Sequence, residues 1–217
     1  NTRVNSDKLT SYVGSNDVIA GEMEAESVIK SIGGKGNVVI LEGPIGQSAQ
    51  IQRLEGNKKA LAECPDVKIL EDQTANWSRA EALSLMENWL TSHSGKINGI
   101  IGQNDEMALG AIEAVKAKGL DPKSIPTAGI DGVTDAVRAV QAGNMVSVLQ
   151  DAAAQAQGGL DVLMRSIVGA SYKPQSDIWT KYSAQGLQWG DGTAKHYNIP
   201  WTPITKENAD AMLAERK

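Results

Sequence analysis

The chain has 217 residues, enough for one large domain or two small ones, and carries a formal net charge of −5. The acid excess argues against a nucleic-acid-binding surface, because a polyanion is bound by a local excess of basic side chains. The sequence has no run of about 18 apolar residues, so it predicts no membrane-spanning helix.

Short apolar runs alternate along the chain with longer amphipathic segments. The expected helices are residues 18–32, 48–61, 78–90, 106–118, 134–141 and 152–168. The expected strands are residues 37–41, 67–70, 97–101, 125–130 and 145–149. Strands and helices that alternate in this way are typical of βαβ units. The sequence therefore predicts an α/β fold: a doubly wound parallel sheet with helices on both faces.

The pattern changes after Tyr172. Residues 173–202 hold three of the five tryptophans and two of the four tyrosines, and they show no clear helical period. Thr205 then has the character of a helix N-cap, which predicts a helix over residues 208–217. The packing of this tail cannot be assigned from the pattern.

Several kinds of chemistry are missing from the sequence. It contains no phosphate-binding loop of the G-x-x-x-x-G-K-[ST] type, no H-E-x-x-H and no G-x-S-x-G. Only His93 and His196 are available as imidazole ligands, so neither a His-rich metal site nor a cofactor is expected. Cys64 is the single cysteine, and we interpret it as a structural thiol at a helix end. The sequence gives little support to an enzyme.

Polar side chains and one indole cluster where the predicted strands end. In a doubly wound sheet, ligands bind beyond the carboxyl ends of the strands. An arginine fork can serve neighbouring hydroxyls, a carboxylate accepts strongly from a hydroxyl, and an aromatic face covers the apolar side of a sugar ring. These residues therefore predict a site for a polyhydroxy compound. They are Arg53, Asn76, Trp77, Asn104, Asp105, Asp131 and Gln150, with Arg3 as a further candidate.

Each of these residues also has a purely structural interpretation. Asn104 can be a helix N-cap, Asp105 can complement the same helix N-terminus, and Asp131 can belong to a simple turn. The other structural interpretations are a solvated helix residue for Arg53, core packing for Trp77 and a surface position for Gln150. The placement of all of them on one rim favours the functional interpretation.

Three segments carry a family resemblance. Residues 103–110 read Gln-Asn-Asp-Glu-Met-Ala-Leu-Gly, residues 129–132 read Gly-Ile-Asp-Gly, and residues 41–49 read Leu-Glu-Gly-Pro-Ile-Gly-Gln-Ser-Ala. Together they resemble the ribose-type periplasmic sugar-binding proteins of ABC importers, and the likeness extends to about Val168. The resemblance implies two doubly wound lobes, joined by three crossing segments, that close on a sugar like a hinge.

The resemblance also implies roles for individual residues. Arg53 matches the sugar-binding arginine of the family, Asn104 the binding asparagine and Asp131 the binding aspartate. Gln150 matches the glutamine at the last hinge crossing, and Trp77 lies where the family often has an aromatic residue.

The length is unusual for this family, because the chain starts at the last strand of the N-terminal lobe. Arg3, or Asn1 beside it, matches the region of an acid/arginine pair that ends that lobe. The resemblance therefore implies one complete lobe plus remnants of the other, in a truncated form that should bind ligand weakly or not at all. The implied parts are residues 1–14 as the end of the N-terminal lobe and first crossing, 15–149 as the C-terminal lobe, 150–172 as the return to the N-terminal lobe, and 173–217 as a tail.

The expected function is the solute-binding component of an ABC importer, periplasmic and non-enzymatic, with a sugar or polyol as ligand and a permease as partner. The main alternative is the effector-binding core of a LacI-type repressor, which would need a helix-turn-helix upstream; an enzyme of this fold is a third class. The helix at residues 152–168 would lack most of its usual sheet. Its apolar stripe, Leu160, Leu163, Met164 and Ile167, is therefore expected to be exposed, repacked or shared with another chain in self-association.

Overall fold

The computed structural model describes residues 2, 4 and 6–216. It divides into two compact units, each formed from separate stretches of the chain. Unit 1 takes in the residues up to Asn16 together with Gln150–Trp201, and unit 2 takes in Asp17–Leu149 together with the residues from Thr202 onward. The tail that the sequence left unassigned is thus shared between the two units. We describe each unit by itself.

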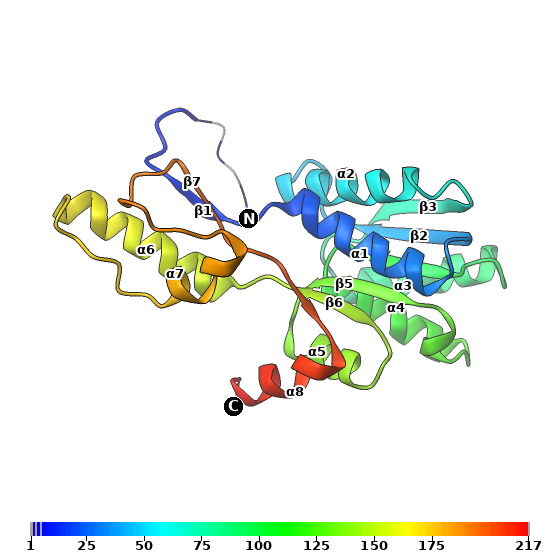
Figure 1. Cartoon of the computed structure of the whole chain (residues 1–217). Coiled ribbons are helices and arrows are strands. Elements are labelled where there is room, and N and C mark those ends of the chain that lie inside the picture. Colours follow the sequence, from blue (N-terminus) through cyan, green and yellow to red (C-terminus); the bar gives the residue numbers. More distant parts are fainter. Residues whose placement is uncertain (1, 3, 5, 217) are drawn as a thin grey trace. The chain divides into compact units, whose positions relative to one another are not determined.

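Unit 2 is built on a six-stranded sheet in the order β3-β2-β4-β5-β6-β8 (Figure 1). The first five strands in this order pair in parallel, and β8 pairs antiparallel with β6, opposing Ile204 to Ser147. The antiparallel edge strand is a feature that the sequence did not predict. The strands are β2 (Gly36–Glu42), β3 (Val67–Thr74), β4 (Gly99–Gly102), β5 (Thr127–Asp131), β6 (Val146–Leu149) and β8 (Thr202–Ile204).

Helices cover both faces of this sheet. The continuous apolar run of β2 explains why: Val38 and Ile40 pack in one hydrophobic cluster, whereas Val39 and Leu41 pack in the other. Helices α1 (Asp17–Ser31) and α2 (Ser48–Ala62) form the first layer. The second layer contains α3 (Arg79–Ser92), α4 (Asp105–Ala117), α5 (Thr134–Gln141) and α8 (Lys206–Ala214), and the short 3₁₀ helix η1 (Pro122–Ser124) leads into β5.

Unit 1 is smaller and owes its core to the aromatic tail. Strand β1 (Tyr12–Gly14) pairs in parallel with β7 (His196–Asn198), and helix α6 (Ala152–Val168) packs against β1 and the short helix α7 (Ile178–Lys181). The 3₁₀ helix η2 (Ser183–Gln185) follows α7 and contacts it. The ring of Trp179 lies 4.8 Å from that of Trp189 and 5.2 Å from that of Tyr197, measured between centroids. The aromatic residues concentrated in the tail therefore form this core.

The structure confirms the predicted fold class and every helix and strand expected up to residue 168. Two boundaries differ from those expected. Strand β3 continues to Thr74 rather than ending near residue 70, because it stays paired with β2 up to Glu42. Helix α8 begins at Lys206, directly after its N-cap Thr205. None of the helices in the described part of the chain combines the length and the apolar character that a membrane span requires.

Candidate functional site

The candidate site lies along the carboxyl edge of the six-stranded sheet of unit 2. Strands β2, β3, β4 and β5 end there at Glu42, Thr74, Gly102 and Asp131. Parallel strands present their carboxyl ends at the same edge, so residues far apart in the chain meet there. The described residues contain no group of acidic, histidine or cysteine side chains suited to hold a metal ion.

Arg53 is the central charge of this edge. It lies in the second turn of α2, and only 4% of its surface is exposed. Its Nε donates to Asp17 Oδ1 at 2.9 Å and its Nη1 donates to the carbonyl oxygen of Gln103 at 2.5 Å. A buried guanidinium needs such partners, because an unpaired buried charge is costly. The side chain is therefore fixed in place rather than solvated on a helix surface.

Asp131 joins Arg53 at the end of β5. Its Oδ1 lies 3.8 Å from Nη1 of Arg53, and its side chain is 32% exposed, so one face of the carboxylate remains open. The backbone at Asp131 has φ of 123°, which is unusual for a residue with a side chain. Burial raises the pKa of Asp131 to about 7, although the nearby charge of Arg53 opposes the rise.

Trp77 covers the end of β2. Its ring centroid lies 5.5 Å from the guanidinium carbon of Arg53, and its Nε1 donates to Gln47 Oε1 at 2.8 Å. The ring passes so close to Gly43 that a Cβ atom there would lie 2.0 Å from it, so only glycine fits. Trp77 and Asn76 both adopt left-handed backbone conformations, with φ of 60° and 53°. This tight turn, costly for residues with side chains, places the indole beside the arginine.

Asn76 is exposed and bonded within the turn that precedes α3. Its Nδ2 donates to Glu81 Oε2 at 2.7 Å, and its Oδ1 accepts from the hydroxyl of Thr74 at 3.2 Å. The amide thus ties the end of β3 to the first turn of α3. In this structure it stabilises the turn that carries Trp77.

Asn104 and Asp105 follow β4 and act differently from one another. Asn104 is the N-cap of α4, because its Oδ1 accepts from the backbone nitrogen of Met107 at 2.9 Å. Its amide nitrogen has no hydrogen-bond partner among the described residues, so it remains available. Asp105 accepts from the backbone nitrogens of Gly132 and Val133 at 2.6 and 2.9 Å. It thereby holds the turn that presents Asp131.

Two further buried acids, Asp105 and Glu24, interact with the charge of Arg53. Burial raises the pKa of Asp105 to about 6, although a bond from the Ser147 hydroxyl at 2.6 Å lowers it. Burial also raises the pKa of Glu24 well above its usual value, against the opposing effect of a hydrogen bond from Asn57. One oxygen of the Glu24 carboxyl has no partner among the described residues. Desolvation is therefore the largest influence on the pKa values of Asp105, Glu24 and Asp131.

The structure thus brings Arg53, Trp77, Asn104 and Asp131 to one edge of unit 2. Gln150 directly follows β6 and belongs to unit 1, where it is half-buried. Arg3 lies outside the described residues.

Sequence reasoning missed two residues that hold this site together. Asp17 begins α1 and pairs with Arg53, although 36 positions separate them. Gln103 accepts from Arg53 through its carbonyl oxygen, and its side-chain Oε1 accepts from the backbone nitrogen of Gly43 at 3.0 Å. Asp17 looks like an ordinary acidic residue in the first turn of a helix, and only its burial reveals the pairing.

Comparisons with known proteins agree on one family. Residues 1–171 match a family profile described as "Periplasmic binding protein domain". A relative from Mycolicibacterium smegmatis, named xylitol-binding protein, is 39% identical over 174 residues, which is 80% of this chain and 49% of the relative. The chain therefore spans about half the length of that relative.

Two solved structures are similar in fold and sequence. An ABC transporter periplasmic solute-binding protein from Actinobacillus succinogenes with bound D-allose has a TM-score of 0.81 and 31% identity, over 97% of this chain and 69% of that one. An ABC transporter solute-binding protein from Bacillus halodurans with bound myo-inositol has a TM-score of 0.81 and 32% identity, over 99% and 67%.

Proposed function

Because this chain belongs to the periplasmic binding protein family, we propose that it is the ligand-binding part of an ABC importer's solute-binding component, with a sugar or polyol as its ligand. The observation that carries the proposal is the pairing of buried Arg53 with the half-open carboxylate of Asp131 at 3.8 Å. This pair offers fixed donors and acceptors side by side at the carboxyl edge of the sheet.

The chemistry of this edge suits a molecule with several neighbouring hydroxyls. Asp131 accepts from a hydroxyl, and the free amide nitrogen of Asn104 donates to another. The indole of Trp77 supplies an apolar face for the C–H groups of the same ligand. We assign Gln150 and Arg3 as further contacts, following the resemblance to ribose-type proteins. Asn76, exposed beside Trp77, is a further candidate contact, and its bonds to Thr74 and Glu81 also stabilise the turn.

The relatives support the same ligand class. Xylitol, D-allose and myo-inositol, which their names and structures give, are all small compounds that carry a hydroxyl on most of their carbons. No reaction is required to recognise such compounds. We therefore assign this chain a binding role rather than a catalytic one, a permease as its partner and the periplasm as its location.

The proposal includes the domain organisation implied by the resemblance. Residues 15–149 correspond to the C-terminal lobe, while residues 1–14 and 150–172 belong to the N-terminal lobe. Binding by closure of the two lobes follows from this correspondence.

Tryptophan indole resonances provide a direct test. Titration of the ¹⁵N-labelled chain with myo-inositol, xylitol and D-allose should move the Nε1–H signal of Trp77, which a Trp77→Phe variant identifies. The signals of Trp89 and Trp179, both buried in hydrophobic clusters, serve as internal controls and should stay in place. We expect weak binding, with Kd on the order of 1 mM.

Asp131→Asn is the matched variant for this titration. It keeps the size and one acceptor oxygen but removes the charge, so it should abolish the shift of Trp77 while the control signals keep their positions. Asp66→Asn, at an exposed position, should behave as the parent chain does. A polyol-induced shift that survives in Asp131→Asn, or none for any of the three compounds, would contradict the proposal.

A further inference from the structure

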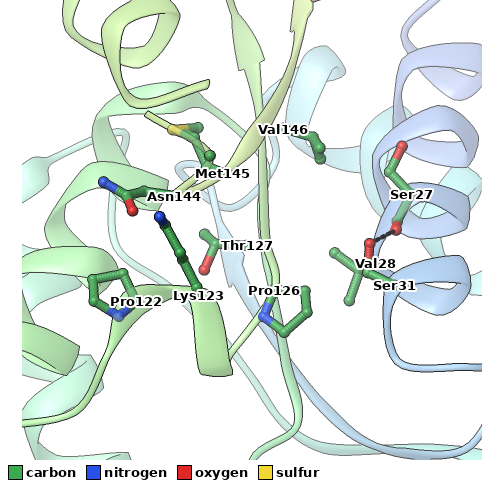
Figure 2. Close-up of a pocket in the computed structure, with 11 residues that line it drawn as sticks. Ser27, Val28, Ser31, Pro122, Lys123, Pro126, Thr127, Asn144, Met145 and Val146 are labelled. Carbon is green, nitrogen blue, oxygen red and sulfur yellow. Dashed lines mark hydrogen bonds between the residues drawn. The ribbon is translucent and has the colours of Figure 1, made fainter. Parts of the chain in front are cut away.

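A second pocket lies at the opposite, amino-terminal edge of the sheet in unit 2 (Figure 2). Strands β5 and β6 begin there, and the end of α1 and the helix η1 border it. Its volume is about 380 Å³, within the range of small-molecule sites. It is lined by Ser27, Val28, Ser31, Pro122, Lys123, Pro126, Thr127, Gly143, Asn144, Met145 and Val146. None of these residues belongs to the proposed sugar site.

The free polar groups of this pocket include an ammonium and an amide nitrogen, both hydrogen-bond donors. Lys123 extends from η1 toward Asn144 (Figure 2). Among the described residues, neither its ammonium nor the side-chain amide of Asn144 has a hydrogen-bond partner. The hydroxyls of Ser27 and Ser31 already donate to carbonyl oxygens of α1, those of Met23 and Ser27, at 2.8 and 2.7 Å. The pocket therefore presents an ammonium and an amide that are free to donate.

A second ammonium reaches the same turn. Gly143 lies between α5 and β6 with φ of 76°, and a Cβ atom there would lie 3.0 Å from Lys206 Nζ and 3.9 Å from Lys123 Cε. Within the described part of the chain, no carboxylate lies within 4.0 Å of either ammonium. Asp121, which is close in sequence, binds the backbone nitrogen of Lys123 at 3.0 Å. Glu207 interacts with Lys206 only through longer-range charge attraction. In a chain of net charge −5, two neighbouring cations without a direct ion pair favour an anion.

The remaining walls are apolar. Val28, Pro126, Met145 and Val146 line the pocket beside the donors. Val28 and Met145 are only 1% and 6% exposed, so the accessible apolar surface of the pocket comes from Pro126 and Val146. An inorganic anion would satisfy the ammonium groups but leave these two side chains in contact with water. A molecule with a short hydrocarbon body and an anionic head satisfies both parts.

We propose that this amino-edge pocket binds a small organic carboxylate. Lys123 and Lys206 hold its two oxygens, the amide of Asn144 adds a hydrogen bond, and the hydrocarbon body packs against Pro126 and Val146. Such a site would let the protein respond to a second metabolite at the edge remote from the sugar.

Binding can be measured on the intact chain by ¹H–¹⁵N NMR. Butyrate should cause saturable shifts of the amides of Gly143–Val146, with Kd on the order of 1 mM, and leave the Trp77 indole unmoved. Butyramide, which has the same shape and no charge, and inorganic phosphate, which has charge and no apolar body, should each bind at least about tenfold more weakly. Equal binding of either probe, or no saturable shift with butyrate, would overturn the proposal.

Charge variants separate the pocket from general attraction. Lys123→Gln and Lys206→Gln should each weaken butyrate binding at least about fivefold, whereas Lys123→Arg should retain it. Lys118→Gln, which removes an exposed lysine bonded to Thr91 at 3.2 Å, is the matched control and should leave the affinity unchanged. If all three glutamine variants bind alike, the lysines of the pocket are not the recognition groups and the proposal fails.

Discussion

Arg53 forms ion pairs with two aspartates that have different roles. Asp17 is almost fully buried, binds Nε of Arg53 at 2.9 Å and fixes the guanidinium. Asp131 lies 3.8 Å from Arg53, is partly exposed and leaves its carboxylate free for a ligand. A fixed arginine beside an open acid is preorganised, because the side chain loses little freedom when a ligand arrives.

The raised pKa of Asp131 makes ligand affinity depend on pH. Burial places this pKa at about 7, so a growing fraction of the acid is protonated as the pH falls below 7. A hydroxyl donates best to the ionised form, and therefore affinity for a polyol should rise from pH 5.5 to pH 8 and level off above the pKa. Below the pKa the loss should approach about tenfold per pH unit. The Trp77 indole titration at several pH values measures this slope.

Asp105 also titrates in this range, with a pKa of about 6, so the Asp131→Asn variant is needed to separate the contributions of the two acids. Asp131→Asn removes one titrating group and leaves the bonds of Asp105 to Gly132 and Val133 in place. Any residual affinity of the variant should show a much flatter pH profile. The same slope in parent and variant would assign the effect to another group.

At the scale of elements, glycines set how closely the helices approach each other. A Cβ atom on Gly56 of α2 would lie 2.1 Å from the carbonyl oxygen of Val18 in α1, and one on Gly21 would lie 2.1 Å from that of Arg53. A Cβ atom on Gly110 of α4 would meet the carbonyl oxygen of Arg79 at the start of α3 in the same way, at 2.2 Å. These close contacts hold the helices that carry the site residues.

Two glycine-to-alanine substitutions should therefore have opposite effects. Gly56→Ala should lower the free energy of unfolding by about 2–3 kcal/mol, because the backbones must separate. Gly159→Ala lies in α6, where a Cβ atom meets nothing within 4 Å, and should raise it by about 0.5–1 kcal/mol through helix propensity. Urea denaturation followed by circular dichroism measures both. A neutral Gly56→Ala would show that the α1–α2 contact adjusts freely.

Asp161 anchors the tail of unit 1 to α6. Its carboxylate accepts from the Tyr172 hydroxyl, the Gln175 nitrogen, both the nitrogen and the hydroxyl of Ser176, and the Trp179 indole, at 2.5–3.2 Å. Burial alone would raise the pKa of Asp161, but these bonds outweigh it and lower the pKa to about 2. One side chain thus orders a loop that has little regular secondary structure.

Removal of this anchor should loosen unit 1 selectively. Asp161→Asn retains the shape but loses acceptor capacity, and should cost about 2–3 kcal/mol. Because the pKa is lowered on folding, the carboxylate contributes stability above its unfolded value near 4, and this is lost as the pH falls toward 2. Tryptophan fluorescence during unfolding reports the change. Asp177→Asn, at an exposed N-cap without a side-chain bond, is the control and should have little effect.

The sequence predicted the elements of unit 2 well for a physical reason. Residues 38–41 face hydrophobic layers on both sides of the sheet, which requires a continuous apolar run. Each helix buries one face, and its apolar residues therefore recur in the sequence with the helical period. Strand β8 could not be predicted, because three residues with Pro203 at the centre show no alternation. The pairing of Asp17 with Arg53 and the bond from the Asn76 amide to Glu81 depend on the folded backbone, which local sequence patterns do not record.

At the scale of the whole molecule, the two units differ in how completely their helices are covered. The helices of unit 2 pack against the six-stranded sheet, whereas the sheet in unit 1 has two strands. Of the three outcomes expected for the apolar stripe on α6, exposure is observed for three of its four residues: Leu160, Leu163 and Ile167 are 59%, 54% and 70% exposed. Met164 is half-buried. Such a patch favours association, because burial of apolar surface is favourable.

We therefore expect this chain to self-associate through α6. Sedimentation or light scattering over a wide concentration range should show a rising mean mass, and the double variant Leu163→Glu/Ile167→Glu should keep the chain monomeric. Ile45→Glu removes a side chain of the same 70% exposure as Ile167 from the other unit, so it controls for a general gain in solubility. Association that persists in the α6 variant, or that Ile45→Glu removes equally well, would show that the contact lies elsewhere. Because α6 is amphipathic and both substituted positions face outward, the variant should leave the Asp161 anchor on the opposite face undisturbed.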